Sequence, residues 1–185
     1  MPHQAPGAHL APREGPDSGR RPFAAHARTV GVIQVGFRPQ SRTGQEVIDP
    51  ETGRALRYGS GGLVGRRAMV VTTVGANAAT TGPRGIHGDI NDVLFPVLHG
   101  TLWYTGMTVV PPLVINDAVR LPGTGYETAA RRLRDRLLTL PDTEPIPFRY
   151  QNGGDYDEHL VLRPVHAPDG VGIRIHYTTP DPATQ

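Results

Sequence analysis

The apolar residues of the chain gather in short segments whose composition predicts strands. Residues 29–37, 66–74 and 107–115 are rich in branched aliphatic side chains and lie between glycine, proline or charged positions, as is typical of β-strands. The segment 66–74 has a continuous apolar centre, which favours a strand buried on both faces, as in a parallel sheet. Because Pro111 and Pro112 cannot donate to a strand ladder, we predict a sheet edge or a strand end within the third segment.

Two further segments carry apolar residues at the three- and four-residue spacing of a helix. The first follows Asp89, a residue type that caps helix N-termini, and contains Pro96, which removes a hydrogen bond and should bend the axis. The second spans residues 126–140 and carries arginines on its opposite face. Its predicted apolar face comprises Tyr126, Ala129, Ala130, Leu133, Leu137 and Leu138. The alternation of strands and helices indicates an α/β sheet.

Composition divides the chain into four parts. Residues 1–28 contain five prolines and three glycines but almost no branched aliphatic residue, which predicts a disordered head because little apolar surface can be buried. Residues 29–62 are irregular and turn-rich around the first candidate strand, and residues 63–150 have the composition of a globular protein. Residues 151–185 form a C-terminal extension with two weak strand candidates. Only two strand–helix units are visible after residue 62, so the predicted α/β fold is incomplete.

Charge and residue usage exclude several classes of protein. The absence of cysteine excludes disulfides, thiolate zinc sites and iron–sulfur clusters. The 19 basic residues, all arginine, are scattered along the chain, and aromatic residues are few, which argues against a nucleic-acid partner. No apolar run is long enough to span a membrane, and the first residues lack the apolar core of a secretory signal. We therefore expect a cytoplasmic protein without a membrane span.

The long loop after the segment 66–74 is the candidate site for chemistry, because ligands of open α/β sheets bind beyond the carboxyl ends of the strands. A loop of this length is usually functional or disordered. Its small residues would let backbone N–H groups approach a planar or anionic ligand, and the N-terminus of the following helix adds partial positive charge. His87 lies between two glycines just before Asp89. A flexible loop with a surface histidine explains the same pattern equally well.

The run of residues 72–115 carries a resemblance to a known family. It contains the element GIHGD at residues 85–89, followed by an apolar helix with an internal proline, and it closely resembles the NAD(P)H:quinone oxidoreductase family. The resemblance begins near Gly61 and extends through Leu140, over roughly 90 residues. It implies a flavodoxin-like, doubly wound parallel sheet of which only the last strand–helix units are present. The family's N-terminal half, which binds the flavin phosphate, has no recognisable counterpart.

The resemblance also implies an activity and a set of site residues. Members of the family pass hydride from NAD(P)H to a bound flavin, usually FAD with FMN as the alternative, and then to a quinone. The residues that match the flavin-binding turn are Thr73, Val74, Gly75 and Ala76. Backbone N–H groups of this turn would stabilise the negative charge of the reduced flavin. His87 matches the histidine that supports the reduced ring, and Thr81 replaces a tyrosine that assists it, which predicts weakened catalysis.

Two interpretations of function follow. In the first, the chain is a truncated quinone oxidoreductase-like flavoprotein that forms a homodimer, with inactivity in isolation as an open alternative. In the second, it is a non-catalytic α/β remnant or dimerisation module that binds no flavin and associates through residues 89–105. We expect no metal site, because no two histidines lie three or four residues apart. Helix capping explains Asp89 better than metal binding does.

Overall fold

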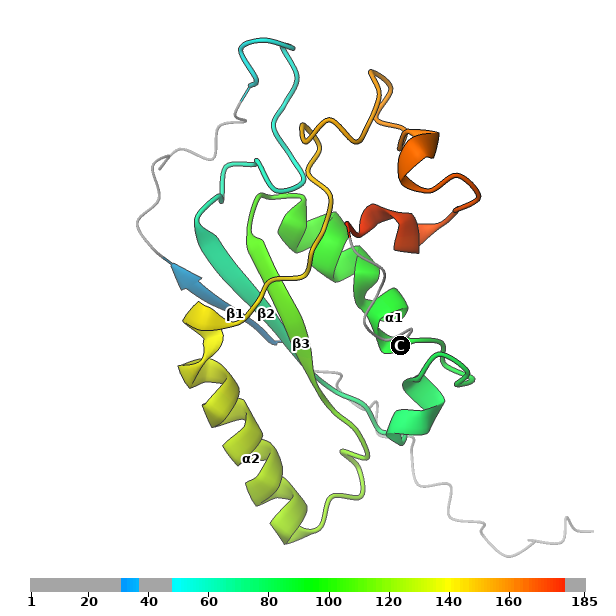
Figure 1. The fold of residues 1–185 in the computed structure, drawn as a ribbon. Coiled ribbons are helices and arrows are strands. Elements are labelled where there is room, and N and C mark those ends of the chain that lie inside the picture. Colours follow the sequence, from blue (N-terminus) through cyan, green and yellow to red (C-terminus); the bar gives the residue numbers. More distant parts are fainter. Residues whose placement is uncertain (1–30, 37–47, 179–185) are drawn as a thin grey trace, which may run out of the picture.

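The computed structural model describes residues 31–36 and 48–178 of the chain, so the predicted disordered head, residues 1–28, lies outside the described residues. Its centre is a three-stranded sheet in the order β1-β2-β3 (Figure 1). Strand β2 (Arg66–Thr73) pairs in parallel with β3 (Thr108–Ile115), and β1 (Gly31–Gly36) pairs antiparallel with β2. The predicted α/β class is confirmed, and the antiparallel β1 makes the described sheet mixed.

Strand β2 is buried on both faces, as its apolar centre predicts. Its side chains alternate between the two faces, so that Ala68 and Val70 join the core on one side of the sheet and Met69 joins the core on the other. All three residues have no solvent exposure. Burial of a valine or methionine side chain contributes about 1.5–3 kcal/mol to stability. The buried strand therefore fixes the position of the turn that follows it.

The two prolines of β3 lie at the outer edge of the described sheet, in agreement with the prediction. The register between β2 and β3 shifts between Met69 and Val71, which places Pro111 and Pro112 opposite the single residue Val70. Such a bulge accommodates residues that cannot donate ladder hydrogen bonds, and an edge strand needs none on its outer side.

Helix α1 (Ile90–Val97) covers one face of the sheet and continues into a π-helical turn, η2 (Leu98–Trp103). The Asp89 side chain accepts a hydrogen bond from the backbone N–H of Asn91 at 2.9 Å, which confirms the predicted cap. Pro96 lies directly before the change from α to π geometry. Because proline has no N–H, the hydrogen bond from residue 96 back to the carbonyl of Asp92 is missing. The N–H of Leu98 still donates to the carbonyl of Leu94, and the wider π-helical turn follows.

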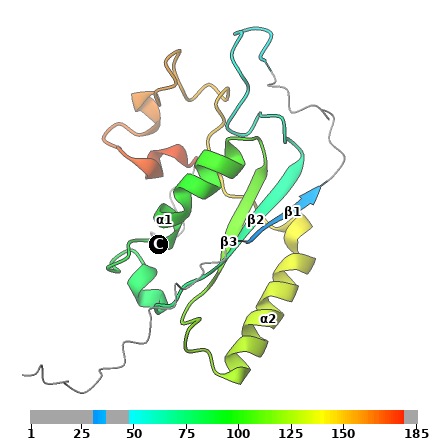
Figure 2. The same ribbon diagram turned by 180° about the vertical axis from the view of Figure 1, so that it is seen from behind.

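Helix α2 (Gly123–Leu138) covers the opposite face (Figure 1 and Figure 2). It begins and ends earlier than the predicted helix, residues 126–140. Two residues of the predicted apolar face are largely exposed, Tyr126 at 71% and Leu138 at 74%. The helix touches the sheet along a narrow stripe. Leu140, in the turn after the helix, is fully buried in the core that Tyr126 and Leu138 do not reach.

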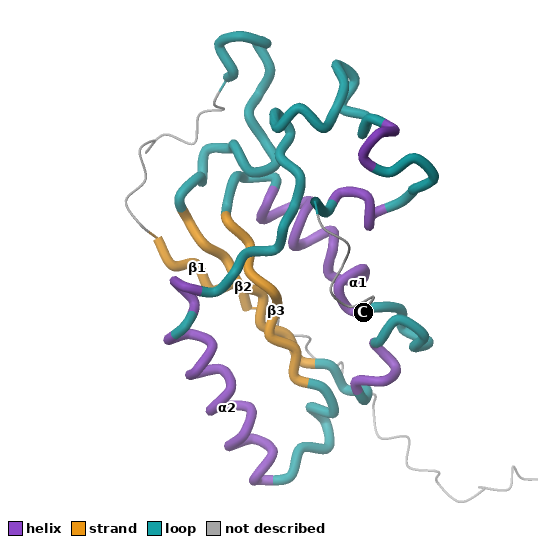
Figure 3. Tube along the Cα trace, viewed as in Figure 1, coloured by secondary structure: helices purple, strands orange, loops and turns teal. Residues whose placement is uncertain are grey.

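The C-terminal segment, residues 148–178, lies over α1 and η2 mostly as loop (Figure 3). The two strands predicted in it, residues 160–163 and 171–177, are wrong. The segment forms isolated bridges and two short 3₁₀ helices, η4 (Pro164–His166) and η5 (Ile173–His176). The proline that begins η4 fixes a helical backbone angle and lacks the N–H that a strand ladder requires.

A close backbone contact joins the segment before β2 to the turn before β3. The N–H of Leu63 donates to the carbonyl of Thr105 at 2.9 Å. Gly106 adopts a positive φ of 94°, and a Cβ atom placed on it would lie 2.6 Å from the backbone N and O of Gly61. Both the backbone conformation and the available space at this position therefore require glycine.

We predict that Gly106→Ala lowers the free energy of unfolding by about 2–4 kcal/mol, because it combines backbone strain with overpacking. Gly100→Ala is the matched control, since no atom lies within 4 Å of its added Cβ. This control should stay within about 1 kcal/mol of the wild type. Urea denaturation of the three proteins measures both values. Equal stability of the two variants would contradict the contact.

Candidate functional site

The turn after β2 and the loop after β3 are joined by backbone hydrogen bonds at the carboxyl ends of the two strands. The N–H of Val74 donates to the carbonyl of Ile115 at 2.9 Å, and the Val74 carbonyl accepts from Ala118 at 3.1 Å. The carbonyl of Ala76 accepts from the N–H of Asp117 at 3.0 Å. The two segments therefore form one connected surface at the edge where ligands of α/β sheets bind.

Two N–H groups of this turn have no hydrogen-bond partner among the described residues. Among the residues that the structure describes, neither Gly75 nor Ala76 donates a backbone hydrogen bond, whereas the preceding N–H of Val74 is occupied. Gly75 is exposed and Ala76 is half-buried. Consecutive backbone N–H groups of this kind can bind an anion or a carbonyl oxygen of a ligand. Of the four residues matched to a flavin-binding turn, these two supply the available donors, and Thr73 is exposed beside them.

Thr81 is turned into the protein rather than toward solvent. It ends the 3₁₀ helix η1 (Ala78–Thr81), which Asn77 caps by accepting from the N–H of Thr80 at 3.2 Å. The Thr81 side chain is buried, and its hydroxyl lies 3.2 Å from the carbonyl of Ala78 and 3.4 Å from Oδ1 of Asn116. This hydroxyl has one proton to donate, and both neighbouring oxygens are acceptors within the protein.

His87 is exposed at the other end of the same loop, and among the described residues its hydrogen bonds come from the backbone alone. Its N–H donates to the carbonyl of Thr80 at 3.0 Å. Within the described part of the chain, no hydrogen bond joins its ring to Thr81. The two predicted catalytic residues thus lie on one loop. The His87 N–H is bound by Thr80, the residue before Thr81, but in the described ranges no hydrogen bond joins the two side chains.

The N-terminus of α1 is neutralised by acidic residues of the chain. Asp89 is only 5% exposed, and its Oδ2 lies 3.3 Å from Nη2 of Arg174, which also contacts Asp92 at 2.9 Å. Asp89 caps the helix and Asp92 lies in its first turn, so both carboxylates offset the positive end of the helix dipole. The partial positive charge that the sequence predicts for a ligand at this point is therefore taken up by Asp89 and Asp92.

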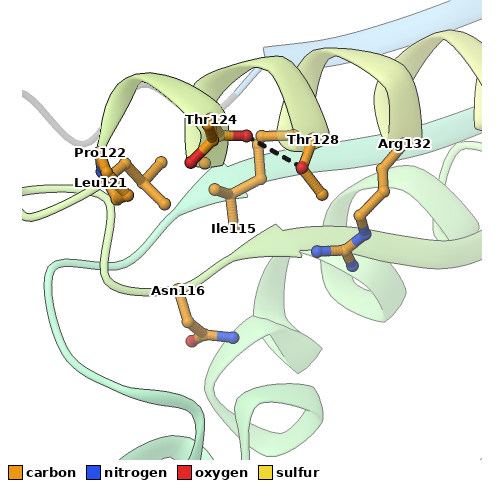
Figure 4. Close-up of a pocket in the computed structure, with 9 residues that line it drawn as sticks. Ile115, Asn116, Leu121, Pro122, Thr124, Thr128 and Arg132 are labelled. Carbon is orange, nitrogen blue, oxygen red and sulfur yellow. Dashed lines mark hydrogen bonds between the residues drawn. The ribbon is translucent and has the colours of Figure 1, made fainter.

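A pocket of about 350 Å³ lies beside the joined loops, between the end of β3 and the first turns of α2 (Figure 4). Asn116, Thr124, Thr128 and Arg132 are among its polar lining residues. Asn116 points away from α2, toward the loop that holds Thr81. Sequence reasoning missed this residue, although its position directly after an apolar strand is a signal for an edge-of-sheet site.

The largest displacements of pKa occur outside the candidate loop. Burial lowers the pKa of His99 to about 4 and raises the pKa of Tyr156 to about 12. Both groups lie where the C-terminal segment covers η2. The described residues contain no group of three or more His, Cys, Asp or Glu side chains suited to a metal ion, and none of their helices has the length and apolar character of a membrane span.

Comparison with protein families and curated sequences agrees with this architecture. The profile of a family described as flavodoxin-like fold matches residues 45–137. A ribosyldihydronicotinamide dehydrogenase-like protein from Penicillium crustosum is 42% identical over 125 residues, which cover 66% of this chain and 46% of that protein. The human ribosyldihydronicotinamide dehydrogenase [quinone] is 31% identical over 90 residues, covering 49% of this chain and 39% of the human protein.

A solved structure is similar over the same share of the chain. The crystal structure of a Klebsiella pneumoniae protein, provisionally named a quinone reductase, superimposes with a TM-score of 0.65 at 46% identity. The match covers 66% of this chain and 48% of that chain. This chain thus spans less than half the length of each of these three relatives.

We predict that Gly85→Ala displaces the loop that carries His87. The added Cβ would lie 2.2 Å from the carbonyl oxygen of Thr80, the acceptor of the His87 N–H. Overpacking of about 1–3 kcal/mol should accelerate hydrogen exchange of the His87 amide about tenfold or more, as NMR can measure. In the control Gly82→Ala the nearest atom is 3.6 Å away, so exchange should not change. Similar exchange rates in both variants would refute the contact.

Proposed function

This chain belongs to the NAD(P)H:quinone oxidoreductase family of flavodoxin-like fold, and on that premise we propose that it binds a flavin at the loops after β2 and β3. The proposed reaction is hydride transfer from NAD(P)H through the flavin to a quinone. We propose FAD as the flavin, with FMN as the alternative, and a cytoplasmic homodimer as the working form. Relatives that carry dehydrogenase and quinone reductase names support the reaction class.

The observation that carries the proposal is the pair of N–H groups at Gly75 and Ala76 that have no partner among the described residues. Bound there, a flavin would supply two-electron hydride chemistry. The two N–H groups would donate to its carbonyl-bearing edge, where negative charge increases on reduction. Because Val74 is held by Ile115 and Ala118, the donors keep a fixed orientation and no reorganisation is needed.

His87 and Thr81 take different parts in this proposal. The exposed ring of His87 would hold or deliver a proton at the reacting face, as histidine commonly does in general acid–base catalysis. Thr81 would act as a positioning residue, because its hydroxyl is engaged with Ala78 and Asn116 inside the protein. Thr81 would fix the loop that carries His87, because the carbonyl of the preceding residue, Thr80, accepts the His87 N–H.

A non-catalytic α/β module is the second candidate function. Asp89 and Asp92 neutralise the N-terminus of α1, so this helix offers no free dipole to a phosphate group. In this alternative the chain binds no flavin and associates with a second copy through α1 and η2, where Val93 is 53% exposed. Light scattering after size exclusion tests the dimer separately from flavin binding.

Flavin binding by the full chain separates the two candidates. We expect that, after incubation with FAD or FMN and removal of free flavin by gel filtration, the protein retains the visible absorbance of the cofactor. The loaded protein should then reduce menadione with NADH or NADPH. A colourless protein that leaves menadione unreduced would reject the oxidoreductase and favour the non-catalytic module.

His87→Ala tests the proposed proton role. Loss of a general acid–base group should lower the rate of menadione reduction by about 100-fold, while bound flavin stays near the wild-type amount. His159→Ala is the control, because its side chain is 78% exposed and lies in the C-terminal extension. Proportional losses of flavin and activity in His87→Ala would show that the residue only supports binding.

A further inference from the structure

The C-terminal segment is held on α1 and η2 by a group of rings centred on His99, which we call the His99 cluster. Its members are Tyr58, Phe95, His99, Phe148 and His176. The His99 ring stacks on Phe95 with centroids 4.6 Å apart and planes 13° apart. From the C-terminal segment, Phe148 lies 5.0 Å from the same ring, edge-on, and His176 stacks on it at 5.7 Å.

The His99 ring is in an environment that does not suit a charge. Its Nε2 atom is buried and has no hydrogen-bond partner in the described structure. Burial is the main cause that lowers the pKa of His99 to about 4, and the nearby His176 contributes in the same direction. A neutral imidazole packs favourably between these rings, whereas an imidazolium would lose its hydration without gaining an acceptor.

The ring of His176 has one hydrogen-bond partner among the described residues, and that contact suits its neutral form. Its Nδ1 lies 2.9 Å from the hydroxyl oxygen of Tyr156, so a neutral ring can accept the hydroxyl hydrogen. Burial raises the pKa of Tyr156 to about 12, which keeps this hydroxyl protonated. Burial, and to a lesser extent the positive charge of Arg149, lower the pKa of His176. A proton on His176 would therefore lie in a half-buried environment beside a like charge.

The acidic side chain that precedes Tyr156, Asp155, is already paired. Asp155 contacts Nη1 of Arg149 at 2.5 Å and Nε2 of His166 at 3.4 Å. The Nε of Arg149 donates to the carbonyl of Ile175 at 2.9 Å, beside His176. In the described part of the chain, no carboxylate forms an ion pair with His99 or His176. The cluster thus lacks a counter-ion that would stabilise a protonated ring.

We propose that His99 and His176 form an acid-sensitive latch, in which the neutral rings hold residues 148–178 on α1 and η2 and a proton on either ring releases them. Once the segment is released, both rings are exposed to water, and a histidine in water has its ordinary pKa of about 6.5. The docked state therefore binds fewer protons than the released one. Docking is fully stabilised above about pH 6.5 and weakens as the pH falls toward the lower docked-state values, about 4 for His99. The latch requires no flavin and is independent of the proposed function.

The single tryptophan of the chain reports directly on the latch. Trp103 donates from Nε1 to the carbonyl of Arg149 at 3.3 Å, and its ring lies 4.7 Å from that of Tyr150. Release of the C-terminal segment removes both contacts. When the full chain is titrated from about pH 7.5 to about pH 4.5, Trp103 fluorescence should shift to longer wavelength. Hydrogen exchange, followed by mass spectrometry, should show residues 148–178 losing protection before β2 and β3.

Replacement of each histidine ring by phenylalanine tests the proposal. His99→Phe and His176→Phe each keep an aromatic ring but cannot gain a proton, so each should lower the midpoint of release by at least about half a pH unit. His159→Gln is the control within the same segment, since its side chain is 78% exposed, and it should release at the wild-type pH. If circular dichroism shows that one phenylalanine variant is unfolded at neutral pH, the release midpoint of the other variant alone tests the proposal. Release of the folded variants at the wild-type midpoint, or simultaneous loss of protection in β2 and β3, would overturn the latch.

Discussion

The burial of β2 between two helical layers is the constraint on which the rest of the structure depends. Ala68 and Val70 pack on the α1 side and Met69 on the α2 side, all without solvent exposure. A strand held on both faces cannot slide or change register without exposing one core. Its carboxyl end is therefore fixed, and so is the turn that follows, residues 74–76. The parallel β3 ends beside it, which allows the two loops to bond to each other.

The two sides of β2 have different consequences. On the α2 side, the narrow contact leaves a pocket at the helix start, lined by Thr124 and Thr128. On the α1 side, the change to a π-helical turn after Pro96 places Leu98 in the core while His99 contacts the C-terminal segment. The proposed flavin site lies at the loops after β2 and β3, and the proposed latch lies over η2. The two are connected at the start of α1, where Arg174 of the latched segment pairs with Asp89, two residues after His87.

The sequence predicts those features of the fold that depend only on neighbouring residues. The apolar centre of β2, the cap at Asp89 and the edge position of Pro111 are all confirmed, because each depends on neighbouring residues. The antiparallel direction of β1 and the exposure of Tyr126 depend on how elements pair in space, which periodicity does not encode. The place of Asn116 after an apolar strand indicates a position at the sheet edge. It does not indicate the contact with Thr81, because that contact joins residues 35 positions apart.

The central claim is that a rigid turn after β2 presents the N–H groups of Gly75 and Ala76 to a flavin. The most direct measurement is a titration of the isotope-labelled full chain with FAD, followed through backbone amide signals by NMR. The account predicts saturable shifts at Gly75 and Ala76 and a smaller shift at Val74, whose N–H is already bonded to Ile115. Saturable shifts that leave Gly75 and Ala76 unmoved, or no shifts at all, would contradict it.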